Sequence, residues 1–385
     1  MWPGEIEGVI CAVSQTQDAE LAAQELASQL LYPNLGFVLF FCSAEYNLDA
    51  LGAALQQNFG GIELVGCTSA GEISAHGYGR GGITALGFDS RNFSVASAPL
   101  KCMDNFSLTD AQQWVDQLIS DCRRNELAPI TGHSFALTLF DGLASREEVV
   151  LGALSTALGS IPHFGGSAGD DNQLARTHVY HSGRFHSGSA VLVLFNTWLN
   201  FEVFTTHHIE PLQQKLVVTR ADSHSRRVYE LNAAPAAQEY AELIGVPLSA
   251  LDQQVFAAHP LAVRIREKYY VRAIQQVHED LSLSFYCAVD NGIVLTAMQP
   301  GPLIPNLEAL FDGLQQRLGP LLVTIGCDCV LRRLEVEAGD DREQVSGFLR
   351  NQRVIGFNTY GEQFNGMHIN QSFTGVAIGR PGGGR

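Results

Sequence analysis

A unit of strand, helix, strand, loop and strand recurs three times along the chain, and this repeat constrains the fold more than any other feature. The first copy begins at Phe37-Val-Leu-Phe-Phe-Cys-Ser43, continues through an amphipathic helical segment, and ends with the strand 82–88. The second copy spans 135–195 and the third spans 321–378. Alternation of strands and helices in this order predicts an α/β fold in which mixed sheets are flanked by helices.

In every copy the second strand runs into a glycine-rich loop that carries a hydroxyl and a carboxylate. Ser69 and Glu72 of the first copy align without a gap with Thr359 and Glu362 of the third, while the second copy is one residue shorter. Such a loop lets backbone N–H groups approach a polar ligand closely, and its side chains offer directed hydrogen bonds. The predicted ligand pocket consists of Gly66, Ser69, Gly71, Glu72, Gly166, Ser167, Asp170, Tyr360, Gly361 and Glu362. Alternatively, the three carboxylates pair with backbone amides and only hold the fold.

The length of 385 residues predicts two lobes, since single hydrophobic cores rarely grow so large. No flexible linker marks their boundary, which we place within 205–225, giving domains at 8–210 and 211–379 and a disordered tail at 380–385. Further helices are expected at 18–31, 108–124, 234–243 and 307–318. The turn Asp290-Asn-Gly292 predicts a hairpin between the strands 281–286 and 293–297.

The charge and the cysteine content limit which binding partners and which cellular compartment are expected. The formal net charge is −16, and only three lysines are present, so nucleic acid and anionic membranes are poor partners. The acidic start does not resemble a signal peptide, and the apolar runs are far shorter than a membrane span. The eight cysteines lie mostly inside apolar runs rather than in a disulfide framework, which favours a reducing cytoplasm.

Three separated motifs resemble the FIST family, whose bacterial sensory proteins combine a FIST N and a FIST C domain. They are 65–72 (Val-Gly-Cys-Thr-Ser-Ala-Gly-Glu), 164–171 (Phe-Gly-Gly-Ser-Ala-Gly-Asp-Asp), and 356–362 (Gly-Phe-Asn-Thr-Tyr-Gly-Glu) with 368–374 (His-Ile-Asn-Gln-Ser-Phe-Thr). The resemblance covers nearly the whole chain and implies a cytoplasmic ligand-sensing protein that acts through signal-transduction partners.

The segments 12–16, 41–46, 163–167 and 180–185 resemble one branch of this family, the haem-containing nitric-oxide sensors. That branch implies haem b as cofactor and regulation of a partner histidine kinase or hybrid kinase, with biofilm formation and cyclic-di-GMP as outputs. A haem-free receptor for a polar metabolite such as an amino acid is the alternative within the same fold. A homodimer is compatible with both.

A haem needs an axial side chain and usually cations for its propionates. His207 and His208 are the favoured axial candidates because the preceding strand 201–206 is apolar, with His259, His368 and His163 behind them. Arg264 and Arg272, with Arg266 between them, are candidate partners of the propionates. No Cys-x-x-Cys-His motif for covalent haem attachment is present.

Two other chemistries have weaker support in the sequence. The run 165–169 (Gly-Gly-Ser-Ala-Gly) matches the nucleophile elbow of hydrolases, but the following residues predict a hairpin rather than the required helix, so a Ser-dependent hydrolase ranks third and no enzyme activity is expected. Cys327 and Cys329 are too closely spaced to bind one zinc ion and have no second cysteine pair nearby, so buried apolar roles are favoured.

Overall fold

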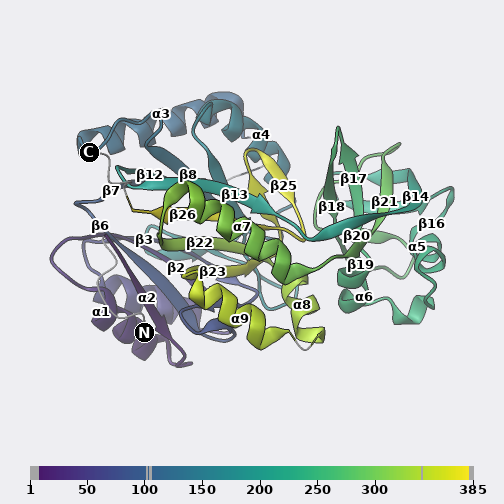
Figure 1. Ribbon diagram of the computed structural model, residues 1–385, viewed down its shortest axis with the longest axis horizontal. Helices are drawn as coiled ribbons and strands as arrows, with labels where there is room; N and C mark the ends of the chain where they lie inside the picture. The colour runs from purple at the N-terminus through teal and green to yellow at the C-terminus, as the bar shows by residue number, and fades with distance from the viewer. Residues whose placement is uncertain (1–7, 101–102, 104–105, 340, 381–385) are drawn as a thin grey trace.

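The computed structural model describes residues 8–100, 103, 106–339 and 341–380, and these form two lobes (Figure 1). The larger lobe contains three six-stranded sheets, and the smaller lobe, at the right of Figure 1, is built around a further sheet. All of the sheets are flanked by helices, and those of the larger lobe mix parallel and antiparallel pairs, as the sequence predicted.

The first repeat is longer than the sequence indicated, because a strand and a helix precede the predicted unit. Its elements are β1 (Val9–Ser14), α1 (Ala19–Leu30), β2 (Leu35–Ser43), α2 (Leu48–Asn58), β3 (Glu63–Ser69), β4 (Glu72–Ser74), β5 (Gly77–Gly79) and β6 (Ile83–Asp89). Both helices start where an Asp18 or Asn47 side chain accepts a hydrogen bond from a backbone N–H three residues on.

The second repeat follows the same order. Its elements are β7 (Phe93–Leu100), α3 (Leu108–Arg124), β8 (Ser134–Phe140), α4 (Glu147–Leu158), β9 (His163–Ser167), β10 (Val179–His181), β11 (Arg184–His186) and β12 (Ala190–Thr197). Ser107 and Asp110 form a capping box that starts α3 at the predicted residue.

The third repeat is interrupted after its first strand by the smaller lobe, and it contains two helices where the sequence indicated one. Its elements are β13 (Asn200–Thr206), α7 (Leu303–Leu318), β22 (Leu321–Cys329), α8 (Val330–Ala338), α9 (Arg342–Asn351), β23 (Val354–Thr359), β24 (Glu362–Phe364), β25 (Met367–Ile369) and β26 (Phe373–Gly379).

The three repeats exchange hairpins in a closed cycle. In each repeat the second strand pairs in parallel with the third and antiparallel with the last, for example β2 with β3 and β6. The hairpin, however, joins another repeat: β4 extends β23, β10 extends β3, and β24 extends β9. The predicted relationship between the three units is therefore confirmed, and their glycine-rich loops lie at corresponding ends of the sheets.

Aromatic rings fill the space where the three sheets face one another. Phe41 of the first repeat stacks on Phe357 of the third with ring centroids 4.4 Å apart, and Phe135 stacks on Phe195 at 4.9 Å. These rings belong to a core with buried side chains from all three repeats. Burial on this scale stabilises the lobe through the hydrophobic effect, and the helices cover the outer faces of the sheets (Figure 1).

The smaller lobe, here called the inserted lobe (209–300), begins at Ile209, two residues before the predicted start of the second domain at 211. The chain then returns, so that 303–379 pack with the larger lobe instead of forming a separate C-terminal half. Its elements are β14 (Ile209–Asp222), β15 (Arg227–Leu231), β16 (Ala234–Pro235), α5 (Ala236–Ile244), a 3₁₀ turn (Leu248–Ala250), α6 (Gln253–Ala258), β17 (Leu261–Ile265), β18 (Lys268–Arg272), β19 (Ile274–Val277), β20 (Leu283–Phe285) and β21 (Val294–Pro300).

The predicted hairpin around Asp290-Asn-Gly292 is wrong. A turn is present there, with Gly292 at a φ of +82°, but β20 pairs with β15 and β19, whereas β21 pairs with β14 and β17. The turn signal was local, while the choice of strand partners was decided by packing elsewhere in the inserted lobe.

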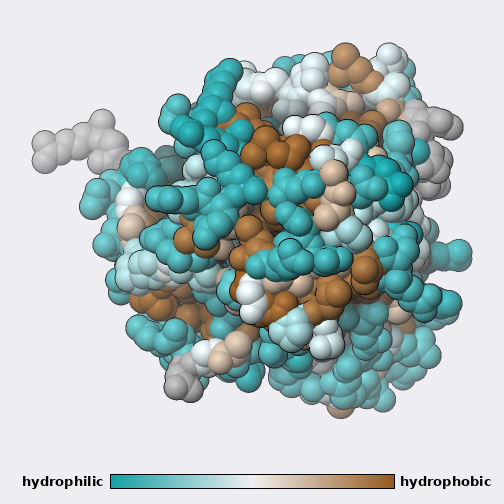
Figure 2. Space-filling model, turned by 90° about the vertical axis from the view of Figure 1, so that its right-hand side faces the viewer, coloured by the Kyte–Doolittle hydropathy of each residue, from teal (hydrophilic) through white to brown (hydrophobic). Residues whose placement is uncertain are grey.

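Figure 2, which faces the inserted lobe, shows hydrophobic patches among hydrophilic atoms, and the exposed large apolar side chains of this lobe are Leu212, Val217, Leu248, Ile265 and Val294. The seven cysteines within the described residues are free. None of the described helices has the length and apolar character needed to cross a bilayer. Of the predicted tail, only Arg380 falls within the described residues.

Candidate functional site

The three glycine-rich loops meet and hydrogen-bond to one another through their backbones. Ala70 N–H donates to Asn358 O at 2.8 Å, Gly169 N–H donates to Thr68 O at 3.0 Å, and Ser167 N–H donates to Gly361 O at 2.9 Å. We call this arrangement the loop junction (68–72, 167–172 and 358–362). It forms because hairpin exchange carries each loop from its own sheet to the next one.

Glu72 and Glu362 occupy corresponding places in the loop junction. Glu72 accepts from Gly82 N–H at 3.2 Å and from Ser69 Oγ at 2.5 Å, and Glu362 accepts from Ser372 N–H at 3.0 Å and from Ser372 Oγ at 2.8 Å. Each carboxylate thus binds the amide ten residues further along the chain, at the start of the last strand. This supports the alternative in which these carboxylates hold the fold.

Asp170 has a different place from the other two carboxylates. Its oxygens accept hydrogen bonds from the backbone N–H groups of Leu174, Ala175 and Arg176 at 3.0, 2.7 and 2.8 Å, and from the hydroxyl of Tyr360. Asp170 therefore organises the long connection between β9 and β10, which the other repeats lack. Asp170 aligns with Glu72 and Glu362 in sequence, but its place in the structure differs. Glu72 and Glu362 each begin a hairpin strand, whereas Asp170 lies in the connection before the hairpin.

Burial raises the pKa of Glu362 to about 8, against 4.5 for an ordinary glutamate, although the hydrogen bonds from Ser372 oppose the shift. Its protonated form therefore contributes stability that is fully present below pH 4.5 and is lost as the pH rises to about 8. We expect the free energy of unfolding of the natural protein to fall over this interval relative to Glu362→Gln, by on the order of 5 kcal/mol. Denaturant titrations across this pH range would measure it. A parallel fall in Glu362→Gln would contradict the assignment, and Glu343→Gln on the surface of α9 is the control.

Gly71 is required because a buried arginine occupies the space beside it. Its φ is +133°, and a Cβ atom there would overlap the guanidinium of Arg333. That guanidinium donates to Gly79 O at 2.8 Å and to Asn358 Oδ1 at 3.1 Å, so it ties the first loop to the third. The absence of a side chain at Gly71 in the predicted ligand loop thus makes room for the Arg333 side chain and not for a ligand.

The inserted lobe covers the loop junction. Its Tyr286 ring lies 5.7 Å from the ring of Tyr360, and both belong to a buried cluster that also contains Ala70, Val271 and Val330. Gln371 Nε2 donates to Ala257 O of the inserted lobe at 2.7 Å. We call this contact region the inter-lobe seam.

Several buried polar side-chain atoms at the loop junction and the inter-lobe seam beside it have no hydrogen-bond partner among the described residues. They include the oxygens Tyr286 Oη, Gln371 Oε1, Glu362 Oε1 and Asn172 Oδ1, and donor nitrogens such as Arg272 Nε. An unpaired buried polar group costs roughly 1 to 3 kcal/mol, so several of them in one region suggest that another molecule can satisfy them.

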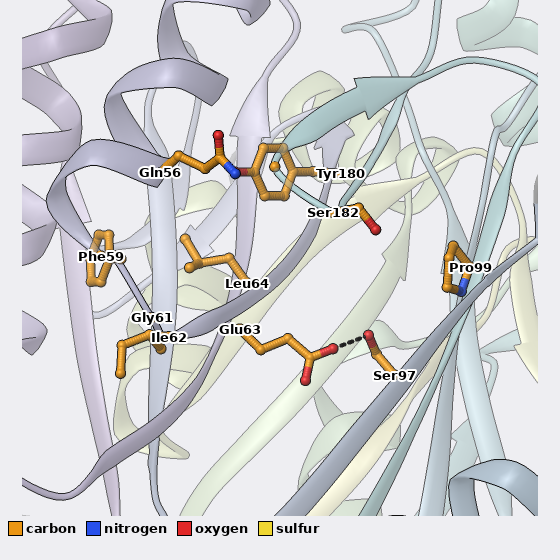
Figure 3. Close-up of a pocket in the computed structure, with 12 residues that line it drawn as sticks. Gln56, Phe59, Gly61, Ile62, Glu63, Leu64, Ser97, Pro99, Tyr180 and Ser182 are labelled. Atoms are coloured by element: carbon orange, nitrogen blue, oxygen red, sulfur yellow. Dashed lines mark hydrogen bonds between the residues drawn. The ribbon is translucent and has the colours of Figure 1, made fainter.

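A surface pocket beside β3 lies away from the loop junction. It has a volume of about 440 Å³, and Figure 3 shows Glu63 pointing toward Ser97 across it, with Gln56 and Tyr180 on another side. Glu63 begins β3 whereas Ser69 ends it, so the pocket and the loop junction are separated by roughly 20 Å of strand. No predicted ligand residue lines this pocket or two others, near Gln352 and near Tyr78.

The structure does not present His207 or His208 to a haem. They lie between β13 and β14 and not within a strand, and His207 is exposed. Both ring nitrogens of His208 are engaged, since Nδ1 accepts from Arg332 at 2.7 Å and Nε2 contacts Glu335 at 2.8 Å. Burial and Arg332 lower the pKa of His208, while Glu335 opposes this shift. Ligation of iron by His208 would break this network.

The remaining haem candidates do not converge on a slot either. His368 is buried, with Nδ1 3.3 Å from Glu148 and Nε2 packed against the Cα of Gly361, and the half-buried His259 ends α6. Arg264 is exposed in the β17–β18 hairpin and pairs with Glu267, next to the exposed Arg266. His163 lies at the start of β9, and Arg272 donates to the carbonyl of Val271. These positions do not fit a haem.

The hydrolase and cysteine-pair interpretations can be compared with the structure directly. Ser167 ends β9 and is followed by a loop instead of a helix, and its hydroxyl is shared between Glu147 at 3.4 Å and Gln363 at 3.2 Å. Cys327 and Cys329 are buried in β22, and burial raises the pKa of both thiols. The helix that an elbow needs is absent after Ser167.

Sequence reasoning missed a polar cluster between α4 and the inserted lobe. Arg226, which is 5% exposed, donates to Glu147 and to Glu148, in each case at 2.6 Å. Glu148 also faces His368 and, within 4.8 Å, Cys287. Adjacent acids at a helix start look like ordinary partners of the helix dipole, so no local signal distinguished them.

Comparisons with known proteins agree with the architecture. A model of the FIST N domain matches residues 36–234, and a model of the FIST C domain matches residues 236–365. No curated protein matches the chain. The first match extends from β2 to β16, inside the inserted lobe, and the second from α5 to β24, so together they cover all three loops of the junction. FIST domains are sensory domains of signal transduction, and this chain belongs to the FIST family.

Proposed function

We propose that this protein is a receptor for a small polar metabolite with an amino group, such as an amino acid, which binds at the inter-lobe seam. The observation that carries the proposal is the set of four unpartnered oxygen atoms at the loop junction and the seam beside it, contributed by Tyr286, Gln371, Glu362 and Asn172. The family's sensory role supports a ligand-binding function.

The type of atom favours the type of ligand. Two of the four are amide oxygens, which only accept hydrogen bonds, and the third, Glu362 Oε1, accepts them once its carboxyl group is ionised. A ligand ammonium group supplies three donors, which suits this set, and the Tyr286 hydroxyl is able to donate to a ligand carboxylate. Transfer of the polar ligand from water into the protein costs free energy. These hydrogen bonds offset that cost only if the seam closes around the ligand.

Two short adjacent segments connect the lobes, which suits a sensor that works by opening and closing. The chain enters the inserted lobe at 206–209 and leaves it at 300–303, and Gly301 N–H donates to His208 O at 2.7 Å. A ligand that binds only when the seam is closed shifts the population toward the closed form. In our proposal, a cytoplasmic histidine kinase recognises this change.

Thermal unfolding of the full chain with each of the twenty amino acids at millimolar concentration tests the proposal. We expect at least one of them to raise the melting temperature by a few degrees, because a ligand at a hundred times its Kd stabilises the folded state by about 2.7 kcal/mol. Tyr286→Phe and Gln371→Met are expected to weaken binding at least tenfold, since each removes a hydrogen bond of roughly 1 to 3 kcal/mol.

A matched control and a competing outcome make the experiment decisive. Tyr240→Phe removes a hydroxyl of the same lobe that donates to His259 O at 2.7 Å; Tyr240 belongs to the core of the inserted lobe and not to the seam cluster, so this change should leave ligand binding unchanged. The competing proposal is a haem-based nitric-oxide sensor. If no amino acid stabilises the protein and added haem gives a stoichiometric Soret band that shifts with nitric oxide, the metabolite receptor is refuted.

A further inference from the structure

Three side chains of different metal-binding types converge where the inserted lobe meets α4. Glu148 lies in the first turn of α4, Cys287 follows β20 in the inserted lobe, and His368 lies in β25. The carboxylate oxygen, the thiol sulfur and the imidazole nitrogen all lie within 4.8 Å of one another. They come from three distant parts of the sequence, so only the tertiary fold brings them together.

Distances and burial at this point suit a bound ion. Glu148 Oε1 is 3.3 Å from His368 Nδ1, and Cys287 Sγ is 2.9 Å from Asn370 Oδ1. Ligand atoms around a tetrahedral zinc ion are separated by about 3 to 4 Å, given bond lengths of 2.0 to 2.3 Å. Cys287 is fully buried and His368 is 4% exposed, whereas the Glu148 side chain is 32% exposed and gives an ion access from solvent.

We propose that Glu148, Cys287 and His368 form a binding site for a divalent transition-metal ion, with zinc as the expected occupant. The Cys287 thiolate, the imidazole Nδ1 of His368 and the Glu148 carboxylate supply three ligands, and Asn370 Oδ1 or a water molecule completes the tetrahedron. One thiolate and one carboxylate neutralise the charge of the ion. Binding releases to solvent the proton of the thiol and any proton on the imidazole.

The surrounding contacts fix the proposed ligands in place. Arg226 donates to the other oxygen of Glu148 at 2.6 Å and to Tyr286 O at 2.8 Å, and Ala288 N–H donates to Glu148 Oε1 at 2.8 Å. Outer contacts of this kind orient ligating carboxylates in metal sites. Because Cys287 belongs to the inserted lobe and the other two ligands to the larger lobe, a bound ion would clamp the lobes together.

Cobalt provides a test that does not depend on the proposed amino-acid ligand. The full chain is stripped of metal with a chelator and titrated with Co²⁺, and we expect one equivalent to produce a thiolate-to-cobalt charge-transfer band in the near ultraviolet, which zinc then removes. Cys287→Ser should lose the band. His368→Gln and Glu148→Gln should each weaken zinc binding at least tenfold.

Controls separate loss of the site from loss of the fold. Cys122→Ala removes another buried thiol, in α3, and should keep the band, and Tyr286→Phe should keep it as well. Circular dichroism checks that each variant is folded, and a rise in the melting temperature of the natural protein with equimolar zinc provides a second measurement. Absence of both the band and the rise in melting temperature in the natural protein overturns the proposal, as does a band that persists in folded Cys287→Ser.

Discussion

Gly356→Ala is expected to destabilise the larger lobe by at least about 3 kcal/mol, in the upper range for a single substitution. A Cβ atom on Gly356 would lie almost on the carbonyl oxygen of Gly326, in the strand paired with it in parallel. Backbone atoms in the middle of a sheet cannot move aside as a flexible side chain can, so the strands must separate and lose hydrogen bonds.

The same collision recurs at the corresponding glycine of each repeat. Gly66 faces the carbonyl of Phe40 and Gly165 faces the carbonyl of Thr138, so alanine at either position should have a similar effect. Gly152→Ala is the control, because that exposed glycine of α4 has no atom within 4 Å of the added methyl group and alanine favours a helix by up to about 1 kcal/mol. Denaturant unfolding measures both changes. Equal stability of Gly356→Ala and the natural protein would show that the strands are less closely spaced than described.

Asp328→Ala is expected to cost roughly 3 to 5 kcal/mol, because it leaves a buried cation without its partner. Arg332 is 1% exposed, and its Nε donates to Asp328 at 2.7 Å, while the hydroxyl of Tyr78 donates to the same carboxylate. Through His208, Arg332 is also connected to the chain segment that enters the inserted lobe. We therefore expect faster proteolysis at 206–209 in this variant, in addition to the lower free energy of unfolding.

A double substitution and an exposed pair test this explanation. Asp328→Leu combined with Arg332→Met removes both charges and should cost less than Asp328→Ala alone, since no buried charge is left unpaired. The exposed pair Arg317–Glu202 has similarly short distances of 2.6 and 2.8 Å, yet Glu202→Ala should cost less than about 1 kcal/mol because water screens it. If the double variant is less stable than both Asp328→Ala and Glu202→Ala, this explanation is wrong. The hydrogen-bond network would then stabilise the fold through more than the pairing of the Arg332 charge.

The repeat was predictable from sequence because its evidence is local. Hydrophobic periodicity placed the strand and helix of each unit, and the spacing from Ser69 to Glu72 matched that from Thr359 to Glu362. The exchange of hairpins was not predictable, because β4 has no preference in its sequence for β23 over a strand of its own repeat. The interruption of the third repeat was missed for a similar reason, since no change in composition marks residue 209.

The candidate site was predicted only in part. The loops were located correctly, but the side chains that complete their surroundings come from elsewhere: Tyr286 from the inserted lobe, Arg333 from α8 and Glu148 from α4. A sequence pattern shows which side chains its own segment contributes. It does not show which side chains from distant segments will contact them. The histidines show the same limit, since the partners of His208 lie more than 120 residues away in the chain.

The closed cycle of hairpins determines when the protein can finish folding during its synthesis. Ile73 of β4 pairs with Gly356 of β23, so the first hairpin has no strand to join until nearly the whole chain has left the ribosome. At 5 to 20 residues per second this delay is roughly 15 to 60 seconds. During that time β4 and the open edge of β3 expose unpaired backbone groups, β3 being covered only when β10 arrives. The nascent chain therefore has a long interval in which it depends on chaperones or on its own charge to avoid aggregation.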